Sequence, residues 1–247
     1  MSTGASRAIE LSVLAPVYNE RDGIEAVLRH WVAVLAGLGL RAEIVLADDG
    51  STDGTSAVLA RLAAELPLLR VLSHPVNRGY GFALGSALAA SRGDMVVTLD
   101  SDGQFDLADL PALLEPYRAR GLDFVTGYRV KKRDGVVRVL ADRGLNLVVR
   151  SLFDTRLRDT NCAMKLIRGE LARALTLEAR GFPTPTEITL KLLAMGAKTD
   201  EAPVRHGERA FGQSKLRVLA TSADTLRFLL YLRWRLRLYR AGVIQSP

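Results

Sequence analysis

The feature that most constrains the fold is a regular alternation of short apolar segments with longer amphipathic ones. Apolar runs that predict buried strands occupy residues 10–15, 42–47, 69–73 and 95–99. Between them, apolar residues recur with helical spacing at 23–38, 55–66 and 80–91. Strands that alternate with helices of this length predict an α/β fold, a mainly parallel sheet with helices on both faces.

The second half of the chain is less regular. It contains predicted strands at 123–126 and 163–167 and predicted helices at 144–153 and 187–195. Two stretches are predicted to be surface loops: the basic stretch 129–138, and 208–215, which carries Gly, Ser and charged residues. Because there is no internal repeat or low-complexity linker, we expect one domain over 1–220 and a C-terminal helical extension over 221–247.

Polar side chains follow three of the predicted strands at the point where each strand ends. They are Tyr18-Asn19-Glu20, Asp48-Asp49-Gly50 and Asp100-Ser101-Asp102. In open α/β sheets, ligands bind beyond the carboxyl ends of the strands. The sequence therefore predicts a binding site along this edge.

Two of these clusters carry carboxylates suited to a ligand. Asp100 and Asp102 can converge on one Mg²⁺ or Mn²⁺ once the chain turns, and Gln104 can add an oxygen. A carboxylate such as that of Asp49 can accept hydrogen bonds from a ribose or from a base edge. The alternative is a solvated turn in which the aspartates cap the helix that begins near Leu107.

Composition and motifs exclude several classes of protein. A single cysteine, Cys162, can form neither an internal disulfide nor a zinc site alone. The polar N-terminus has no apolar core of a secretory signal, and no stretch reaches the ~18 apolar residues of a membrane span, so a cytoplasmic protein is expected. Gly79-Tyr80-Gly81 is a poor dinucleotide fingerprint, because the next glycine, Gly85, comes one place too late.

Charge is distributed unevenly along the chain. Residues 1–127 hold more acidic than basic side chains, whereas residues 128–247 hold the excess of Lys and Arg that makes the net charge +7. The basic half could hold phosphates, lie on an anionic membrane or bind nucleic acid. A nucleic-acid-binding module is disfavoured, because no helix-turn-helix, zinc-finger or RNP-type signature is present.

The motifs in their order resemble the inverting family 2 glycosyltransferases, which have the GT-A fold. These motifs are PVYNE (16–20), ADDGSTDGT (47–55), NRGYGFALGSALAASRGD (77–94) and LDSDGQ (99–104). Three further motifs resemble the polyprenyl- or dolichyl-phosphate mannosyl- and glucosyltransferases: GYR (127–129), DTNCAMKLIRGE (159–170) and GERAFGQSKL (207–216). The resemblance covers roughly residues 10–220.

The resemblance implies roles for particular residues. The nucleoside of a GDP- or UDP-sugar donor would be held by Pro16, Tyr18, Glu20, Ala47 and Asp49. Asp100, Asp102 and Gln104 would bind Mg²⁺ or Mn²⁺, and Ser101 would contact the donor. Arg129, Arg209 and Lys215 match basic positions that handle phosphate during catalysis; solvated surface cations are the alternative for the last two.

One departure from related patterns bears on the acceptor. Family members that act on sugar hydroxyls often carry Thr-Glu-Asp, whose aspartate is the general base, but Ile188 follows Thr186-Glu187 here. A phosphomonoester needs no such base, because its second pKa of about 6 leaves it mostly ionised at neutral pH. A polyprenyl phosphate is therefore the favoured acceptor. A lipid or sugar hydroxyl stays the alternative, with Glu187 or another carboxylate as base.

The C-terminal segment 226–240 mixes leucines, aromatic residues and arginines and is too charged to span a bilayer. It could be an interfacial helix whose arginines and Trp234 lie at the depth of the lipid headgroups. This predicts peripheral binding to the cytoplasmic face of an anionic membrane. The alternative is a helix that packs on the domain or on a second subunit of a homo-oligomer.

Overall fold

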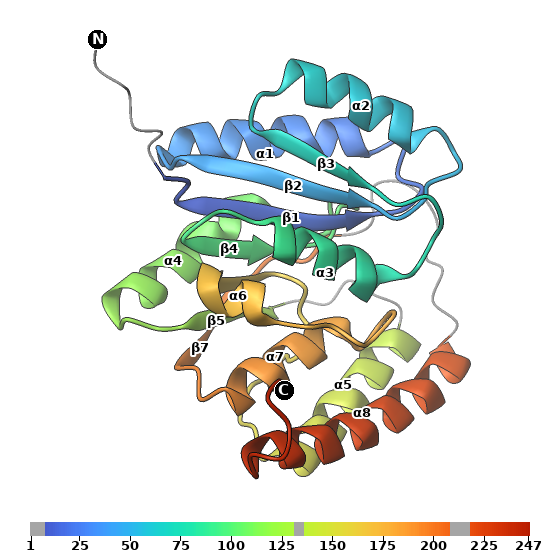
Figure 1. Cartoon of the computed structure of the whole chain (residues 1–247), viewed down its shortest axis with the longest axis vertical. Helices are drawn as coiled ribbons and strands as arrows, with labels where there is room; N and C mark the ends of the chain where they lie inside the picture. The colour runs from blue at the N-terminus through green and yellow to red at the C-terminus, as the bar shows by residue number, and fades with distance from the viewer. Residues whose placement is uncertain (1–7, 131–135, 208–217) are drawn as a thin grey trace.

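The computed structural model describes residues 8–130, 136–207 and 218–247, and within them one seven-stranded sheet (Figure 1). The strands lie in the order β3-β2-β1-β4-β6-β5-β7, and β6 alone among them runs antiparallel to its neighbours. They are β1 (Leu11–Val17), β2 (Ala42–Asp48), β3 (Leu69–Ser73), β4 (Met95–Thr98), β5 (Phe124–Arg129), β6 (Lys165–Arg168) and β7 (Thr199–Val204). The predicted α/β class with a mainly parallel sheet is confirmed.

Helices cover both faces of the sheet (Figure 1). They are α1 (Ile24–Leu38), α2 (Thr55–Glu65), α3 (Tyr80–Ala90), α4 (Leu110–Ala119), α5 (Val136–Phe153), α6 (Gly169–Ala174), α7 (Thr184–Ala194) and α8 (Val218–Arg240), with a 3₁₀ turn at Leu107–Asp109. Side chains of α1, α2 and α4 pack on one face, and those of α3, α6 and α7 pack on the other.

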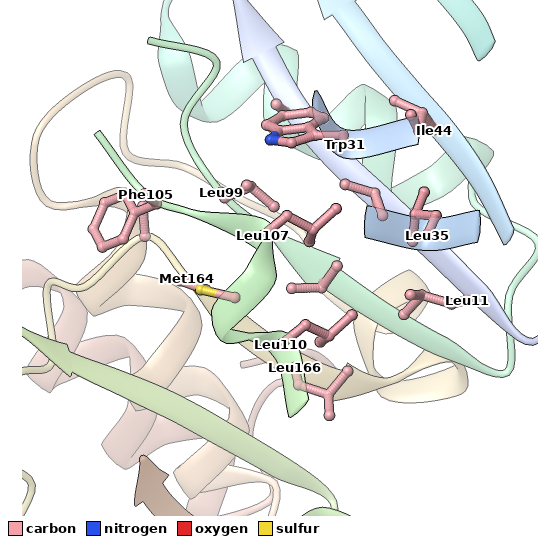
Figure 2. Close-up of a cluster of buried hydrophobic side chains, with 14 of the residues drawn as sticks. Leu11, Trp31, Leu35, Ile44, Leu99, Phe105, Leu107, Leu110, Met164 and Leu166 are labelled. Atoms are coloured by element: carbon pink, nitrogen blue, oxygen red, sulfur yellow. The ribbon is translucent and has the colours of Figure 1, made fainter. Parts of the chain in front are cut away.

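The first core layer fills the space between α1, α4 and the sheet. Trp31 of α1 and Leu110 of α4 lie in one cluster with Leu11 of β1, and all three are almost fully buried (Figure 2). Burying a side chain of this size stabilises the fold by roughly 1.5–3 kcal/mol. This layer holds β1, β2 and β4 in place, and their carboxyl ends form the edge described below.

A third apolar cluster joins α8 to the rest of the protein. Leu229, Leu232 and Leu236 of α8 pack against Val149 of α5 and Leu190 of α7. The helix therefore packs on the domain along one side, which was one of the expected alternatives. Its other side leaves large apolar residues exposed: Leu226, Leu230, Tyr231 and Trp234. No helix within the described ranges is both long enough and apolar enough to cross a bilayer.

The predicted loop over residues 129–138 needs correction at both of its ends. The basic stretch 129–138 is not a loop throughout, because β5 continues to Arg129 and α5 already begins at Val136. Strand β5 pairs with β7 as far as Arg129, and this pairing extends β5 beyond its apolar residues. The predicted loop 208–215 lies outside the described residues, and the boundary between domain and extension at 220/221 stays a prediction.

Candidate functional site

The loops that follow β1, β2 and β4 are tied to one another by hydrogen bonds. Ser101 Oγ donates to the carbonyl oxygen of Pro16 over 2.8 Å, so the loop after β4 is fixed to the end of β1. The amide of Asn19 donates to Ser51 Oγ (2.9 Å), and that of Glu20 donates to Thr55 Oγ1 (3.0 Å). The three polar clusters that the sequence places at strand ends therefore form one continuous edge.

Asp49, at the end of β2, organises the beginning of α3. Its carboxylate accepts hydrogen bonds from the backbone amides of Arg78 (3.0 Å) and Gly79 (2.7 Å). His74 Nδ1 lies 3.1 Å from Asp49 Oδ1, and the other ring nitrogen of His74 lies 3.1 Å from Ser86 Oγ. Since Asp49 is almost fully buried, these contacts fix both the carboxylate and the loop that leads into α3.

The carboxylate of Asp100 is held by a side chain at the beginning of α3. Tyr80 is the first residue of α3, and its hydroxyl donates to Asp100 Oδ1 over 2.8 Å. Burial, together with the negative charges of Asp100 and Asp102, raises the pKa of Tyr80 well above its ordinary value. The phenol therefore stays protonated and remains a hydrogen-bond donor to the carboxylate.

Asp102 and Gln104 lie in the turn after Asp100. Asp102 Oδ1 accepts a hydrogen bond from the amide of Gln104 (3.0 Å), and Gly103 between them has a φ of 75°, which glycine adopts without strain. The side-chain amide of Gln104 donates to the carbonyl oxygen of Gly207 (3.2 Å), which ties this turn to the segment after β7.

Asp100 and Asp102 are the two carboxylates that the sequence suggests as ligands of a hard cation. Among the described residues, no group of three or more His, Cys, Asp and Glu side chains is arranged to hold a metal ion. Mg²⁺ in phosphate-binding sites is often held by one or two carboxylates, with substrate phosphates and waters as its other ligands. Two carboxylates at this edge fit that kind of site.

Arg129, at the end of β5, forms a buried ion pair with Asp159. Its Nε and Nη2 atoms lie 2.7 and 2.9 Å from the two carboxylate oxygens, an arrangement in which both partners are fixed. The side chains are 10% and 3% exposed. Arg129 is thus held firmly at the same end of the sheet as the aspartates, because β5 is parallel to β1, β2 and β4 through β6.

Two fully buried groups, Lys165 and Cys162, lie beside this ion pair. Lys165 Nζ donates to Thr126 Oγ1 (2.9 Å) and to the carbonyl oxygen of Thr160 (3.1 Å), and burial lowers its pKa to about 8. Burial raises the pKa of Cys162 to about 12, so the thiol stays protonated and unreactive.

Glu187, the carboxylate left open as a general base, is fully buried in α7. Its oxygens accept hydrogen bonds from the backbone amides of Glu178 (2.9 Å) and Ala179 (2.9 Å). It also forms an ion pair with Lys191, whose Nζ lies 3.0 Å from Oε1. These contacts give Glu187 a structural role.

The other residues expected at the donor site are distributed unevenly. Tyr18 and Glu20 lie partly exposed in the loop after β1, whereas Ala47 is fully buried in the core beneath the edge. Arg209 and Lys215 lie outside the described residues. Their roles stay predictions.

Sequence reasoning did not identify three side chains that shape the site: His74, Tyr80 and Asp159. Tyr80 and Asp159 stand inside motifs that carry the resemblance, but no spacing rule shows which carboxylate or guanidinium each one contacts. For His74 we find no signal in the sequence beyond its position one residue past a predicted strand.

Comparison with known proteins gives a family. Residues 12–167 match the family described as Glycosyl transferase family 2. An undecaprenyl-phosphate 4-deoxy-4-formamido-L-arabinose transferase of Edwardsiella ictaluri is 33% identical over 207 residues, which are 83% of this chain and 62% of that protein. One with the same name from Pseudomonas paraeruginosa is 37% identical over 209 residues, or 83% and 60%. The chain thus spans about three fifths of these relatives.

Solved structures with the same fold include complexes with phosphoglyceric acid and with UDP-glucose. Glucosyl-3-phosphoglycerate synthase from Mycobacterium tuberculosis, in complex with phosphoglyceric acid, aligns with a TM-score of 0.69 and 26% identity, over 92% of this chain and 80% of that one. The same enzyme in complex with Mn²⁺, UDP-glucose and phosphoglyceric acid aligns with a TM-score of 0.68 and 27% identity, with the same coverage. These neighbours confirm the expected GT-A fold.

Proposed function

The chain belongs to glycosyl transferase family 2 and is a glycosyltransferase, and we propose that it transfers one hexose from a GDP- or UDP-sugar to a polyprenyl phosphate. The matched region, 12–167, contains Asp49, Asp100, Asp102 and Arg129. Relatives that are named undecaprenyl-phosphate transferases support a polyprenyl phosphate as acceptor.

The donor would bind along the edge formed by the loops after β1, β2 and β4. Asp49 and its neighbours would face the nucleoside, and Asp100 and Asp102 would hold Mg²⁺ or Mn²⁺, with Gln104 as the further candidate ligand. A divalent cation there would neutralise charge that develops on the leaving diphosphate. The neighbour crystallised with Mn²⁺ and UDP-glucose supports this choice of metal and donor class.

The observation that carries the acceptor proposal is the environment of Glu187. Ile188 replaces the aspartate that serves as base in relatives acting on hydroxyls, and Glu187 is engaged by two backbone amides and by Lys191. An acceptor that is already ionised suits a site of this kind. An oxygen of the acceptor phosphate would attack the anomeric carbon as the bond to the diphosphate breaks, and the diphosphate would leave with the electron pair on the opposite face, which inverts the anomeric centre.

The proposal predicts that the acceptor phosphate is required. We expect UDP- or GDP-hexose with Mn²⁺ to give a glycolipid from undecaprenyl phosphate and none from undecaprenol. The lipid product would be separated by chromatography, and its anomeric configuration determined by NMR. Transfer to undecaprenol at an equal rate would contradict a phosphate nucleophile and favour the hydroxyl alternative.

A second acceptor class follows from the solved neighbours. The enzyme that resembles this chain over 92% of its length was crystallised with phosphoglyceric acid, a small phosphorylated acid. Phosphoglyceric acid therefore belongs in the same acceptor panel. If sugar is transferred to it and none to undecaprenyl phosphate, the lipid acceptor is wrong while the donor chemistry stands.

We also propose that α8 contacts the membrane surface that contains such an acceptor. Its exposed side carries Leu226, Leu230 and Trp234, which recur every four residues and thus form one stripe. Arg227 and Arg237 on this side are exposed and would face anionic headgroups. In a symmetric dimer the same arginines would approach one another, so a membrane is the better partner for this surface.

The experiment that tests this surface uses point variants, because truncation after Asp224 would remove the buried Leu229, Leu232 and Leu236. We expect Leu230→Glu/Trp234→Glu to reduce co-sedimentation with phosphatidylglycerol vesicles several-fold at low salt. Val76→Glu is the control, since Val76 is 60% exposed in the loop after β3. If the Leu230→Glu/Trp234→Glu variant and the control pellet equally with the vesicles, the stripe does not contact the membrane. If the Leu230→Glu/Trp234→Glu variant instead loses self-association in sedimentation velocity, the stripe is a subunit interface.

A further inference from the structure

The segment 176–180, between α6 and α7, is held by two buried side chains of α7. Glu187 accepts hydrogen bonds from the amides of Glu178 and Ala179. Lys191 Nζ donates to the carbonyl oxygen of Thr176 over 2.6 Å and lies 3.0 Å from Glu187. Both α7 side chains are fully buried, so the backbone of this segment is fixed by charge-assisted hydrogen bonds shielded from water.

The carbonyl groups of this segment lie directly against the beginning of α3. A Cβ atom at Gly81 would be 1.8 Å from the carbonyl oxygen of Ala179, and one at Gly79 would be 2.4 Å from that of Arg180. Only glycine permits such an approach of two backbones. Any displacement of the segment 176–180 therefore alters the packing of Gly79 and Gly81.

The beginning of α3 in turn holds both carboxylates proposed for donor binding. The amide of Gly79 donates to Asp49 Oδ2 (2.7 Å), and the hydroxyl of Tyr80 donates to Asp100 Oδ1 (2.8 Å). Two consecutive residues, Gly79 and Tyr80, thus fix Asp49, which is proposed to face the nucleoside, and Asp100, which is proposed to hold the metal.

The side chain of Glu178 connects this arrangement to α8. Tyr231 OH donates to Glu178 Oε1 over 3.0 Å. Arg235 Nε lies 3.2 Å from Oε2, within ion-pair distance although without hydrogen-bond alignment, and Lys191 Nζ lies 3.3 Å from the same oxygen. Glu178 therefore has one partner in α7 and two in the C-terminal helix.

We infer that Glu178 is a positioning residue that couples the docking of α8 to the placement of Asp49 and Asp100. The inference rests on the donor role proposed above for these two carboxylates. When α8 is displaced, Glu178 loses the hydroxyl of Tyr231 and the guanidinium of Arg235, and the side-chain hydrogen bonds that remain to the segment 176–180 among the described residues come from α7. The loop before α3 then loses part of its support. Because α8 also carries the exposed apolar stripe, a surface that binds this helix would act on the donor site through Glu178.

The test compares Glu178→Ala with Tyr231→Phe/Arg235→Met, which removes both α8 partners while retaining their apolar parts. We expect faster hydrogen exchange at residues 78–84 and about fivefold weaker binding of UDP or GDP with Mn²⁺ in calorimetry for both, a change within the range of remote couplings. Arg240→Met is the matched control, because Arg240 is an exposed arginine at the last residue of α8. It should leave both readouts unchanged.

The combined variant separates coupling from a general loss of stability. If Glu178 acts through α8, joining Glu178→Ala with Tyr231→Phe/Arg235→Met should weaken nucleotide binding no further than Glu178→Ala alone. Full additivity, or unchanged exchange at 78–84 in both parent variants, would overturn the inference. Failure of the wild-type protein to bind either nucleotide would contradict the proposed donor, and the exchange measurement would still decide the coupling.

Discussion

Replacing Asp102 by alanine is expected to reduce sugar transfer about a thousandfold or more while the protein stays folded. A bound cation contributes several kcal/mol of charge stabilisation in the transition state, and each 1.4 kcal/mol is a factor of about ten in rate. Asp102 lies partly exposed in the turn after β4, outside the apolar core. Its loss therefore removes one of the two carboxylates proposed to hold the metal without opening a cavity.

The control for this variant is Asp94→Ala. Asp94 is an exposed carboxylate at the amino end of the same strand, so its removal changes the charge of the protein equally but far from the proposed site. Thermal unfolding with Mn²⁺ and UDP or GDP is the binding readout, because a ligand that binds the folded state raises its melting temperature. Wild-type turnover and the full Mn²⁺-dependent shift in Asp102→Ala would show the metal assignment to be wrong.

The first half of the fold was predictable because each element has a simple pattern. Residues 44–47 of β2 are continuously apolar, as expected for a strand buried on both faces, and α1 shows its buried Leu28, Trp31 and Leu35 at helical spacing. Parallel strands then place all their carboxyl ends on one edge. Topology alone therefore brought Asp49, Asp100 and Asp102 near one another.

Elements with weaker patterns were predicted incompletely or missed: for α4 only a helix start near Leu107 was named, and β7 was not predicted. Helix α4 contains Pro111 in its first turn and Pro116 in its interior, and proline is an ordinary signal for a helix end. Strand β7 reads TDEAPV, which is polar and includes Pro203, yet it lies at the edge of the sheet, where proline is tolerated. In both elements tertiary packing outweighs local preference.

The contacts that complete the site were not predictable from spacing. Tyr80 and Asp100 are 20 residues apart, and Arg129 and Asp159 are 30 apart, on elements whose relative placement depends on the whole sheet. The sequence also left Glu187 open as a base, because the motif shows that the residue is acidic but not what surrounds it. Its burial and its two amide donors come from the packing of α7 against the segment 176–180.

This environment predicts that Glu187 is needed for stability and dispensable as a base. We expect Glu187→Ala to lower the free energy of unfolding by about 3–5 kcal/mol, because it leaves Lys191 buried without its nearest carboxylate and two backbone amides without acceptors. For a chain of this length such a loss corresponds to a melting temperature lower by about 10 °C. Thermal and urea unfolding measure it.

Glu187→Gln separates the structural role from the catalytic one, since the amide oxygen can still accept from a backbone N–H but cannot take a proton. A general base must reach the proton that it removes, and its loss typically costs about 10²–10⁴-fold in rate. We expect the glutamine variant to be destabilised, yet to retain kcat for undecaprenyl phosphate within about tenfold at saturating donor, because an ionised phosphate has no proton to give up. If Glu187→Gln has an unchanged free energy of unfolding and a kcat that is about 10²–10⁴-fold lower, Glu187 is the base. The acceptor would then be a hydroxyl, and α7 would have to present this carboxylate to the substrate in a conformation other than the one in which Ala179 and Lys191 enclose it.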